Sequence, residues 1–193
     1  MRREVSMKRL LGLCVLVLTF PLMASAGGDE KDPSKWVPIK IPGKQKLPEF
    51  TDIEEWVNSK ALSAADLKGK VVVVHFYACG CSNCIANYPW YKAIWKEFKD
   101  KGVVVIGIHT PETEGEKDSK RVKKKAETAE LTFPIAIDNK TKMWQLYDNH
   151  VWPTIYLFDK EGLARWGWVG ELGWKGARGE SHMRKKLEEL LKE

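Results

Sequence analysis

Two apolar, β-branched runs separated by a helix-like segment constrain this chain more than any other feature. The runs are Val71–Tyr77 and Val103–His109, and the segment between them, 84–100, ends at Lys101 and Gly102. Strands that are apolar along their whole length, rather than at alternate residues, are typical of a sheet that is covered on both faces. The order of strand, helix and strand therefore predicts an α/β fold.

The rest of the chain continues this alternation of strand and helix signals. Segment 117–129 is charged and helix-prone, and its lysine run indicates a solvated face rather than a binding patch. Together the segments predict a single domain with a central mixed sheet flanked by helices. The other expected elements are a short helix at 52–58, a helix start at Thr110, a strand at 133–137, a helix at 142–147, a hairpin of 154–158 and 163–169, and a helix at 181–192.

The first 26 residues have the three parts of a secretory signal peptide. Four basic residues precede a mostly apolar stretch, Leu10 to Leu22, and the small residues Ala24 to Ala26 form a cleavage pattern. The stretch is shorter than the roughly 18–20 residues that span a bilayer, so we expect cleavage, with membrane attachment only through an uncleaved signal. This predicts a periplasmic or secreted protein. Residues 27–50 are expected to form an extended lead-in to a domain at 51–193.

Charge and cysteine content restrict the function further. The chain has a net charge of +6, which falls to +3 without residues 1–26, because these contain four basic residues and one acid. Such a balance does not imply nucleic acid as a partner. Cys14 lies in the expected signal, and the other three cysteines lie between positions 79 and 84. In an oxidising compartment, such a cluster implies a catalytic disulfide, a pair kept reduced by a donor, or a metal site.

Cys81 and Cys84 lie where the first apolar run gives way to a helix. Backbone N–H groups and the positive end of the helix dipole stabilise an anion there, so the first sulfur can ionise near neutral pH. Cys81 would then attack a substrate sulfur, and Cys84 would resolve the mixed disulfide. Zinc sites use the same spacing, but no second Cys/His pair stands at metal-ligand spacing. We therefore expect no metal and no cofactor other than this disulfide.

These motifs together resemble the thioredoxin fold, and more narrowly the exported TlpA/ResA-like thiol-disulfide oxidoreductases of the redoxin (AhpC/TSA-like) superfamily. The resemblance covers roughly residues 50–192 and rests on 67–78, the Cys81/Cys84 pair, Val103–His109 and 151–159. Stretches 109–112, 137–139 and 152–153 are also similar to the thioredoxin-like domain of DipZ-type membrane proteins.

The resemblance implies roles for further residues. The family proline that matches Pro153 is cis and faces the disulfide, so Trp152, Pro153 and Thr154 would contact the substrate. His75 aligns with a buried acid that shuttles a proton in many thioredoxins, and it is either a base or a hydrogen-bonded core histidine. Asn87 aligns with a glutamate of ResA-like members, so this chain has neither acid.

Three more residues are candidates for accessory roles. Cys79 is a second resolving thiol, an oxidation-sensitive accessory, a soft metal ligand with His75 or His109, or a buried thiol without a role. His109 and Glu112 follow the strand beside the active-site strand. They should lie at the carboxyl edge of the sheet, where ligands gather in α/β folds, unless they only form a turn.

The leading hypothesis is an exported thiol-disulfide oxidoreductase that acts on cysteines of other exported proteins, in cytochrome c maturation or disulfide repair. The resemblance implies a membrane electron donor of the CcdA or DsbD type, although no residue identifies it. One alternative is a copper-binding module similar to Sco proteins that uses Cys79, Cys81, Cys84 and a histidine, although the cysteine spacing departs from that pattern. The other is a redoxin-type thiol peroxidase, whose motif is missing before Cys81.

Overall fold

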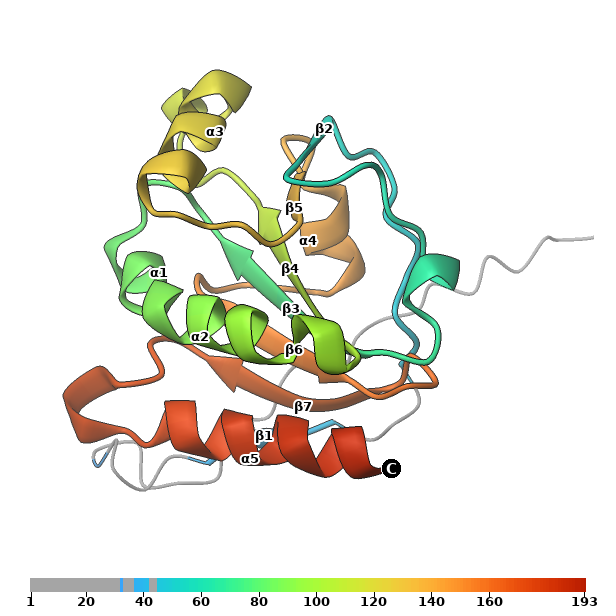
Figure 1. Cartoon of the computed structure of the whole chain (residues 1–193). Helices are drawn as coiled ribbons and strands as arrows, with labels where there is room; N and C mark the ends of the chain where they lie inside the picture. The colour runs from blue at the N-terminus through green and yellow to red at the C-terminus, as the bar shows by residue number, and fades with distance from the viewer. Residues whose placement is uncertain (1–31, 33–36, 42–44) are drawn as a thin grey trace, which may run out of the picture.

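A computed structural model of the chain describes residues 32, 37–41 and 45–193, and the expected signal peptide at 1–26 lies outside them. A seven-stranded sheet in the order β1-β7-β6-β3-β4-β5-β2 forms the centre, with helices on both sides (Figure 1). The strands are β1 (Ile39–Lys40), β2 (Glu55–Val57), β3 (Val71–Tyr77), β4 (Val103–His109), β5 (Ile135–Ile137), β6 (Thr154–Phe158) and β7 (Ala164–Val169). The α-helices are α1 (Ser82–Ala86), α2 (Tyr88–Phe98), α3 (Ser119–Thr128), α4 (Lys142–Leu146) and α5 (Gly179–Lys192).

The sheet is mixed, as the sequence predicts. β3 runs parallel to β4, and β4 runs parallel to β5, whereas β6 is antiparallel to both β3 and β7. Every residue of β3 is buried, because this strand has a neighbour on each edge and packed helices on each face. The fold is the expected thioredoxin-like arrangement of a central sheet flanked by helices.

Side chains that alternate along β3 divide the interior into two cores. The first lies under α2, α3 and α5, and the second lies under α4 and the segment that precedes β3. This division follows from the period of two in a strand, which sends successive side chains to opposite faces. Val71, Val73 and Tyr77 enter the first core, and Val72, Val74 and Phe76 enter the second.

The helix expected at 84–100 is interrupted in the structure. Asn87 is both the last boundary residue of α1 and the first boundary residue of α2, and Pro89 occupies the second position of α2. Proline has no backbone N–H and is tolerated in the first turn of a helix but not in its interior, so a helix restarts here. The buried Asn87 side chain donates to the carbonyl of Gly170 at 3.2 Å and accepts from the amide of Leu172 at 2.8 Å. Asn87 thereby joins the helix break to the loop before α5.

Two expected helices are absent from the described residues at their predicted positions. In place of the helix at 52–58, β2 pairs antiparallel with β5 and covers the edge of the sheet. The helix expected to start at Thr110 is replaced by a single 3₁₀ turn, Glu114–Glu116, which Thr113 caps. The apolar residues of 52–58 therefore belong to an edge strand, and the segment after Thr110 forms a capped turn instead of a helix.

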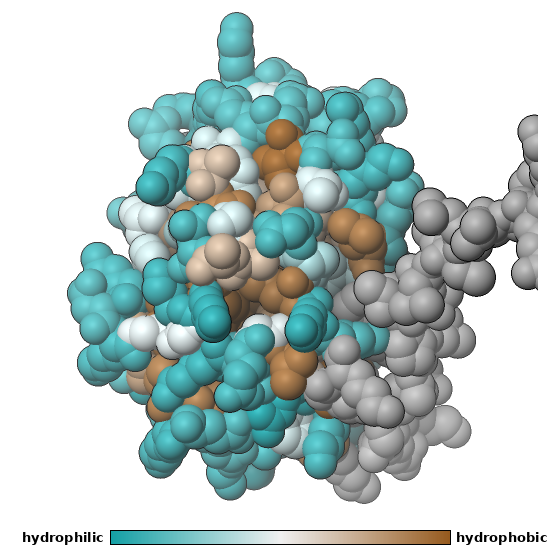
Figure 2. All heavy atoms as spheres, turned by 90° about the vertical axis from the view of Figure 1, so that its right-hand side faces the viewer, coloured by the Kyte–Doolittle hydropathy of each residue, from teal (hydrophilic) through white to brown (hydrophobic). Residues whose placement is uncertain are grey.

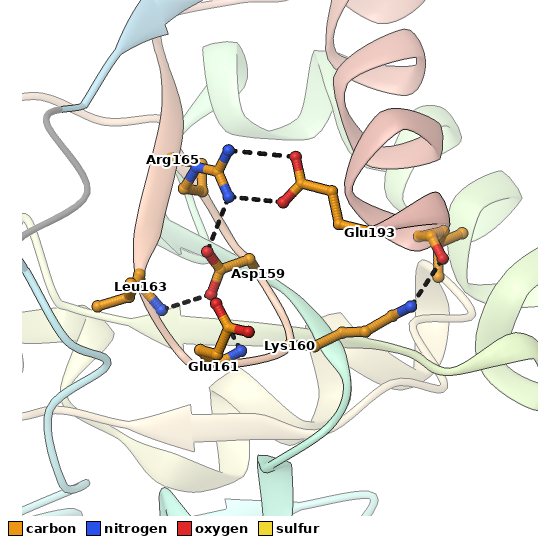
Figure 3. Close-up of polar contacts among 7 residues, drawn as sticks. Asp159, Lys160, Glu161, Leu163, Arg165 and Glu193 are labelled. Atoms are coloured by element: carbon orange, nitrogen blue, oxygen red, sulfur yellow. Dashed lines mark hydrogen bonds and ion pairs between the residues drawn. The ribbon is translucent and has the colours of Figure 1, made fainter.

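The ends of the described chain pack on the sheet. β1 pairs with β7, and Ile41 and Leu47 are buried in the second core, so this part of the lead-in is attached to the sheet. At the other end, the Arg165 guanidinium donates to the Asp159 and Glu193 carboxylates at 2.9 and 2.7 Å (Figure 3). These bonds fasten the end of α5 to the turn between β6 and β7.

The side of the molecule opposite α1 is mostly hydrophilic, with apolar residues at its centre (Figure 2).

Candidate redox site

Cys81 ends the turn from β3 into α1, and Cys84 lies in the first turn of α1. The amide of Cys81 donates to the carbonyl of Ala78 at 3.2 Å, and Cys81 is the N-cap residue of α1. Cys81 and Cys84 form a disulfide with their Cα atoms 5.3 Å apart. The Sγ atom of Cys81 also accepts a hydrogen bond from the backbone N–H of Cys84 at 3.3 Å. Cys81 is half-buried, whereas Cys84 is completely buried. Of the two residues, only Cys81 is therefore partly exposed to solvent.

The segment before β6 supplies the second part of the site. The Trp152–Pro153 peptide bond is cis, which confirms the prediction made from the family resemblance. The half-buried Trp152 donates from Nε1 to the carbonyl of Thr110 at 3.1 Å and stacks on Trp144 with ring centroids 4.1 Å apart. Thr154 begins β6, and its hydroxyl donates to the carbonyl of Val151 at 2.7 Å. Trp152 and Cys81 both pack at the margin of the first core.

His75 lies inside the first core rather than at the surface. Its ring stacks on Tyr91 with centroids 3.8 Å apart, and Phe133 and Tyr77 lie against it. Neither ring nitrogen has a hydrogen-bond partner among the described residues. Burial lowers the pKa of His75 to about 3. His75 is thus a neutral core histidine at ordinary pH, without the hydrogen bond that the sequence led us to consider.

His109 ends β4 and is buried at the carboxyl edge of the sheet, as expected. Its Nε2 lies 2.9 Å from the carbonyl oxygen of Glu116, and because a carbonyl can only accept, Nε2 carries the proton. Burial lowers the pKa of His109, and the bond to Glu116 opposes this only in part. The expected neighbour Glu112 is exposed, and its backbone N–H, rather than its carboxylate, contacts this region through Glu116.

Cys79 is a free, buried thiol beside a buried acid that the sequence analysis missed. Its Sγ lies 4.0 Å from Oε1 of Glu116. Burial raises the pKa of Cys79, and the nearby Glu116 carboxylate adds to the effect, while Arg121 and Lys125 oppose it. The sequence did contain one signal for Glu116, because Thr113 and Glu116 have the spacing of a capping box.

Residues 32, 37–41 and 45–193 contain no group of three or more His, Cys, Asp or Glu side chains arranged to hold an ion. Over the same residues, no helix has both the length and the apolar character needed to cross a bilayer.

Comparison with known proteins places the chain in a family. The AhpC/TSA family matches residues 44–166. ResA of Bacillus cereus, a thiol-disulfide oxidoreductase, is 33% identical over 129 residues, which cover 66% of this chain and 69% of ResA. The chain therefore belongs to the AhpC/TSA family, in which its relatives of similar length are thioredoxin-like thiol-disulfide oxidoreductases.

Two further relatives define the extent of the similarity. A crystal structure of a thiol-disulfide isomerase from Corynebacterium glutamicum superposes with a TM-score of 0.63 at 27% identity, over 77% of this chain and 97% of that one. Protein DipZ of Mycobacterium tuberculosis is 38% identical over 121 residues, which are 61% of this chain but 17% of DipZ. The chain thus spans less than a fifth of the length of DipZ.

Proposed function

We propose that this protein is an exported thiol-disulfide oxidoreductase that exchanges disulfides with cysteines of other exported proteins through Cys81 and Cys84. The observation that carries this proposal is the difference in burial between residues Cys81 and Cys84, because exchange needs one accessible nucleophile and one protected resolving thiol. The hydrogen bond from the Cys84 amide to the Cys81 sulfur supports the assignment, since a donor at that atom stabilises a thiolate.

The reaction transfers two electrons without any other cofactor. In the reduced protein, the Cys81 thiolate attacks a substrate disulfide, forms a mixed disulfide and releases one substrate thiolate. The Cys84 thiolate then attacks Cys81, releases the second substrate thiolate and forms the Cys81–Cys84 disulfide. The substrate is reduced by the two electrons that the protein loses, so a donor must reduce the protein again.

The surroundings of the pair support a protein substrate. Ile85, next to Cys84, and Val151, next to Trp152, each expose 45% of their surface. We infer that these side chains and the half-buried Trp152 offer apolar contacts to an extended peptide, since Trp152 and Cys81 pack against the same core. Pro153 directly precedes β6, and Thr154 is its first residue.

Location and electron source complete the proposal. The signal-like residues 1–26 support export to the periplasm or the secreted space. In that compartment the protein would act as a reductant in cytochrome c maturation or disulfide repair, and a membrane donor of the CcdA or DsbD type would reset it. Nucleic acid and metal have no part in this function.

Trapping experiments test the two cysteine roles. Cys84→Ser is expected to accumulate mixed disulfides with a peptide disulfide substrate, because the resolving thiol is gone, whereas Cys81→Ser is expected to abolish turnover. Cys79→Ser is the matched control, and it should retain turnover. A Cys81→Ser chain that reduces the peptide at the wild-type rate would contradict the proposal.

A further inference from the structure

The carboxylate of Glu116 is the point where two distant segments of the site meet. Glu116 is buried, and its Oε2 accepts hydrogen bonds from the backbone N–H groups of Glu112 at 2.8 Å and Thr113 at 3.1 Å. Its Oε1 accepts a third bond at 2.6 Å, from the backbone N–H of Gly80. A turn that follows β4 is thereby tied to the loop that carries Cys81, 36 residues earlier in the chain.

Turn capping alone does not account for this arrangement. A capping box needs one carboxylate oxygen, and Oε2 already supplies it through the bonds within its own turn. Oε1 is therefore available to accept the hydrogen bond from Gly80, in the loop that carries Cys81. Charge-assisted bonds of this type are shorter and stronger than neutral ones, so the Gly80 contact fixes the residue that directly precedes Cys81.

The close approach depends on glycine at position 80. A Cβ atom added there would lie 2.7 Å from Oε1 of Glu116, well inside van der Waals contact. Gly80 does not have a left-handed backbone, so its conformation is open to other residues and the restriction comes from this contact. A glycine between Cys79 and Cys81 therefore leaves the space that the Glu116 carboxylate occupies.

The same oxygen also faces the third cysteine, because Cys79 Sγ lies 4.0 Å from Oε1. A Cys79 thiolate could attack the Cys81 sulfur of the Cys81–Cys84 disulfide. A Cys79–Cys81 bond would then form and Cys84 would leave as a thiolate, so no oxidant is needed. A neighbouring carboxylate opposes this reaction, because it accepts a hydrogen bond from the thiol and repels the negative charge that ionisation would create.

We propose that Glu116 is a positioning residue for the redox pair, which holds the Gly80 amide in place and keeps Cys79 as a protonated thiol outside disulfide exchange. This inference rests on the proposed function only in taking Cys81 and Cys84 as the exchanging pair. It assigns Glu116 no contact with substrate.

Disulfide mapping tests the inference. In a full chain carrying Cys14→Ser, free thiols are blocked after equilibration in a glutathione buffer, and the disulfide-linked peptides are quantified by mass spectrometry. Glu116→Gln keeps the shape of the side chain but points an amide N–H₂ group at one of the backbone donors. We expect it to raise the share of disulfides that contain Cys79 at least tenfold. Glu114→Gln, an exposed change in the same turn, should leave the share at the wild-type level.

Two further variants make the test independent of the folding of Glu116→Gln. Gly80→Ala displaces the carboxylate without removing its charge and should also raise the share of disulfides that contain Cys79. In a Cys14→Ser chain that also carries Cys81→Ser and Cys84→Ser, Cys79 is the remaining thiol, and native protein should react with iodoacetamide at least tenfold more slowly than denatured protein. Wild-type pairing in both Glu116→Gln and Gly80→Ala, or equal labelling rates, would overturn the inference. The mapping does not depend on turnover, so failure of the proposed function would appear separately, in Cys81→Ser.

Discussion

The buried His75 predicts a specific pH dependence of stability. Its folded-state pKa of about 3 lies below the unfolded value of 6.5, so the unfolded chain binds more protons between these two pH values. Stability from this group is therefore complete above about pH 6.5 and is lost as the pH falls towards 3. Replacing His75 by Leu, which has a similar volume, removes the titrating group and should remove this part of the pH dependence.

The magnitude follows from linkage. One proton taken up on unfolding changes the free energy of unfolding by about 1.4 kcal/mol per pH unit. With the two pKa values above, wild type should lose about 2 kcal/mol between pH 7 and pH 5 through His75 alone. The ring is completely buried, so solvent screening does not reduce this figure appreciably.

Urea unfolding at pH 7, 6 and 5 measures the effect. The difference in free energy of unfolding between wild type and His75→Leu should shrink, or move in favour of the variant, by about 2 kcal/mol from pH 7 to pH 5. Other groups, including the buried His109, titrate in both proteins and cancel in this difference. His150→Gln changes an exposed histidine and serves as the control. Parallel pH profiles for wild type and His75→Leu would refute the reasoning.

Two other predictions concern stability and can be measured by urea unfolding at pH 7. Asn87→Ala should cost about 1–3 kcal/mol, because the amide of Leu172 would lose its partner in the interior, and a change below about 0.5 kcal/mol would argue against this role. Arg165→Gln should cost about 2 kcal/mol, because it removes the charged donor of the buried Asp159 carboxylate. Glu193→Gln, at the exposed side of the same network, should change the free energy of unfolding by at most about 0.5 kcal/mol.

The sequence predicted those parts of the fold in which the local pattern and the packing agree. The sequence predicts β3 and β4 because continuous apolar, β-branched runs are typical of strands buried on both faces, and the structure confirms both. The helix predicted at 52–58 was wrong, because the apolar spacing of this segment fits a short helix as well as a strand. Only the partner strand β5, about 80 residues away in sequence, makes it an edge strand. Pairing of this kind is not visible in a local pattern.

The same limit applies to the site. The positions of Cys81 and Cys84 follow from a strand, a turn and a helix that are adjacent in sequence, and the structure joins the two residues in a disulfide. Glu116 was missed because an acid in a charged, polar stretch looks like a surface residue. Its burial becomes apparent only when the turn after β4 folds against the loop after β3. The sequence analysis noted Asn87 only because ResA-like proteins have a glutamate at this position. In the structure its side chain forms hydrogen bonds with the loop before α5.

The most direct test of the account is a redox titration of the full chain with quantified thiols. It compares wild type with three variants, each of which replaces one cysteine by serine. We predict one two-electron couple in wild type, retained in Cys79→Ser and lost in both Cys81→Ser and Cys84→Ser. A reduction potential near or below about −270 mV, the value of thioredoxin, would fit the proposed reductant. A couple that survives Cys81→Ser, or that disappears in Cys79→Ser, would contradict the assignment of Cys81 and Cys84 as the redox pair.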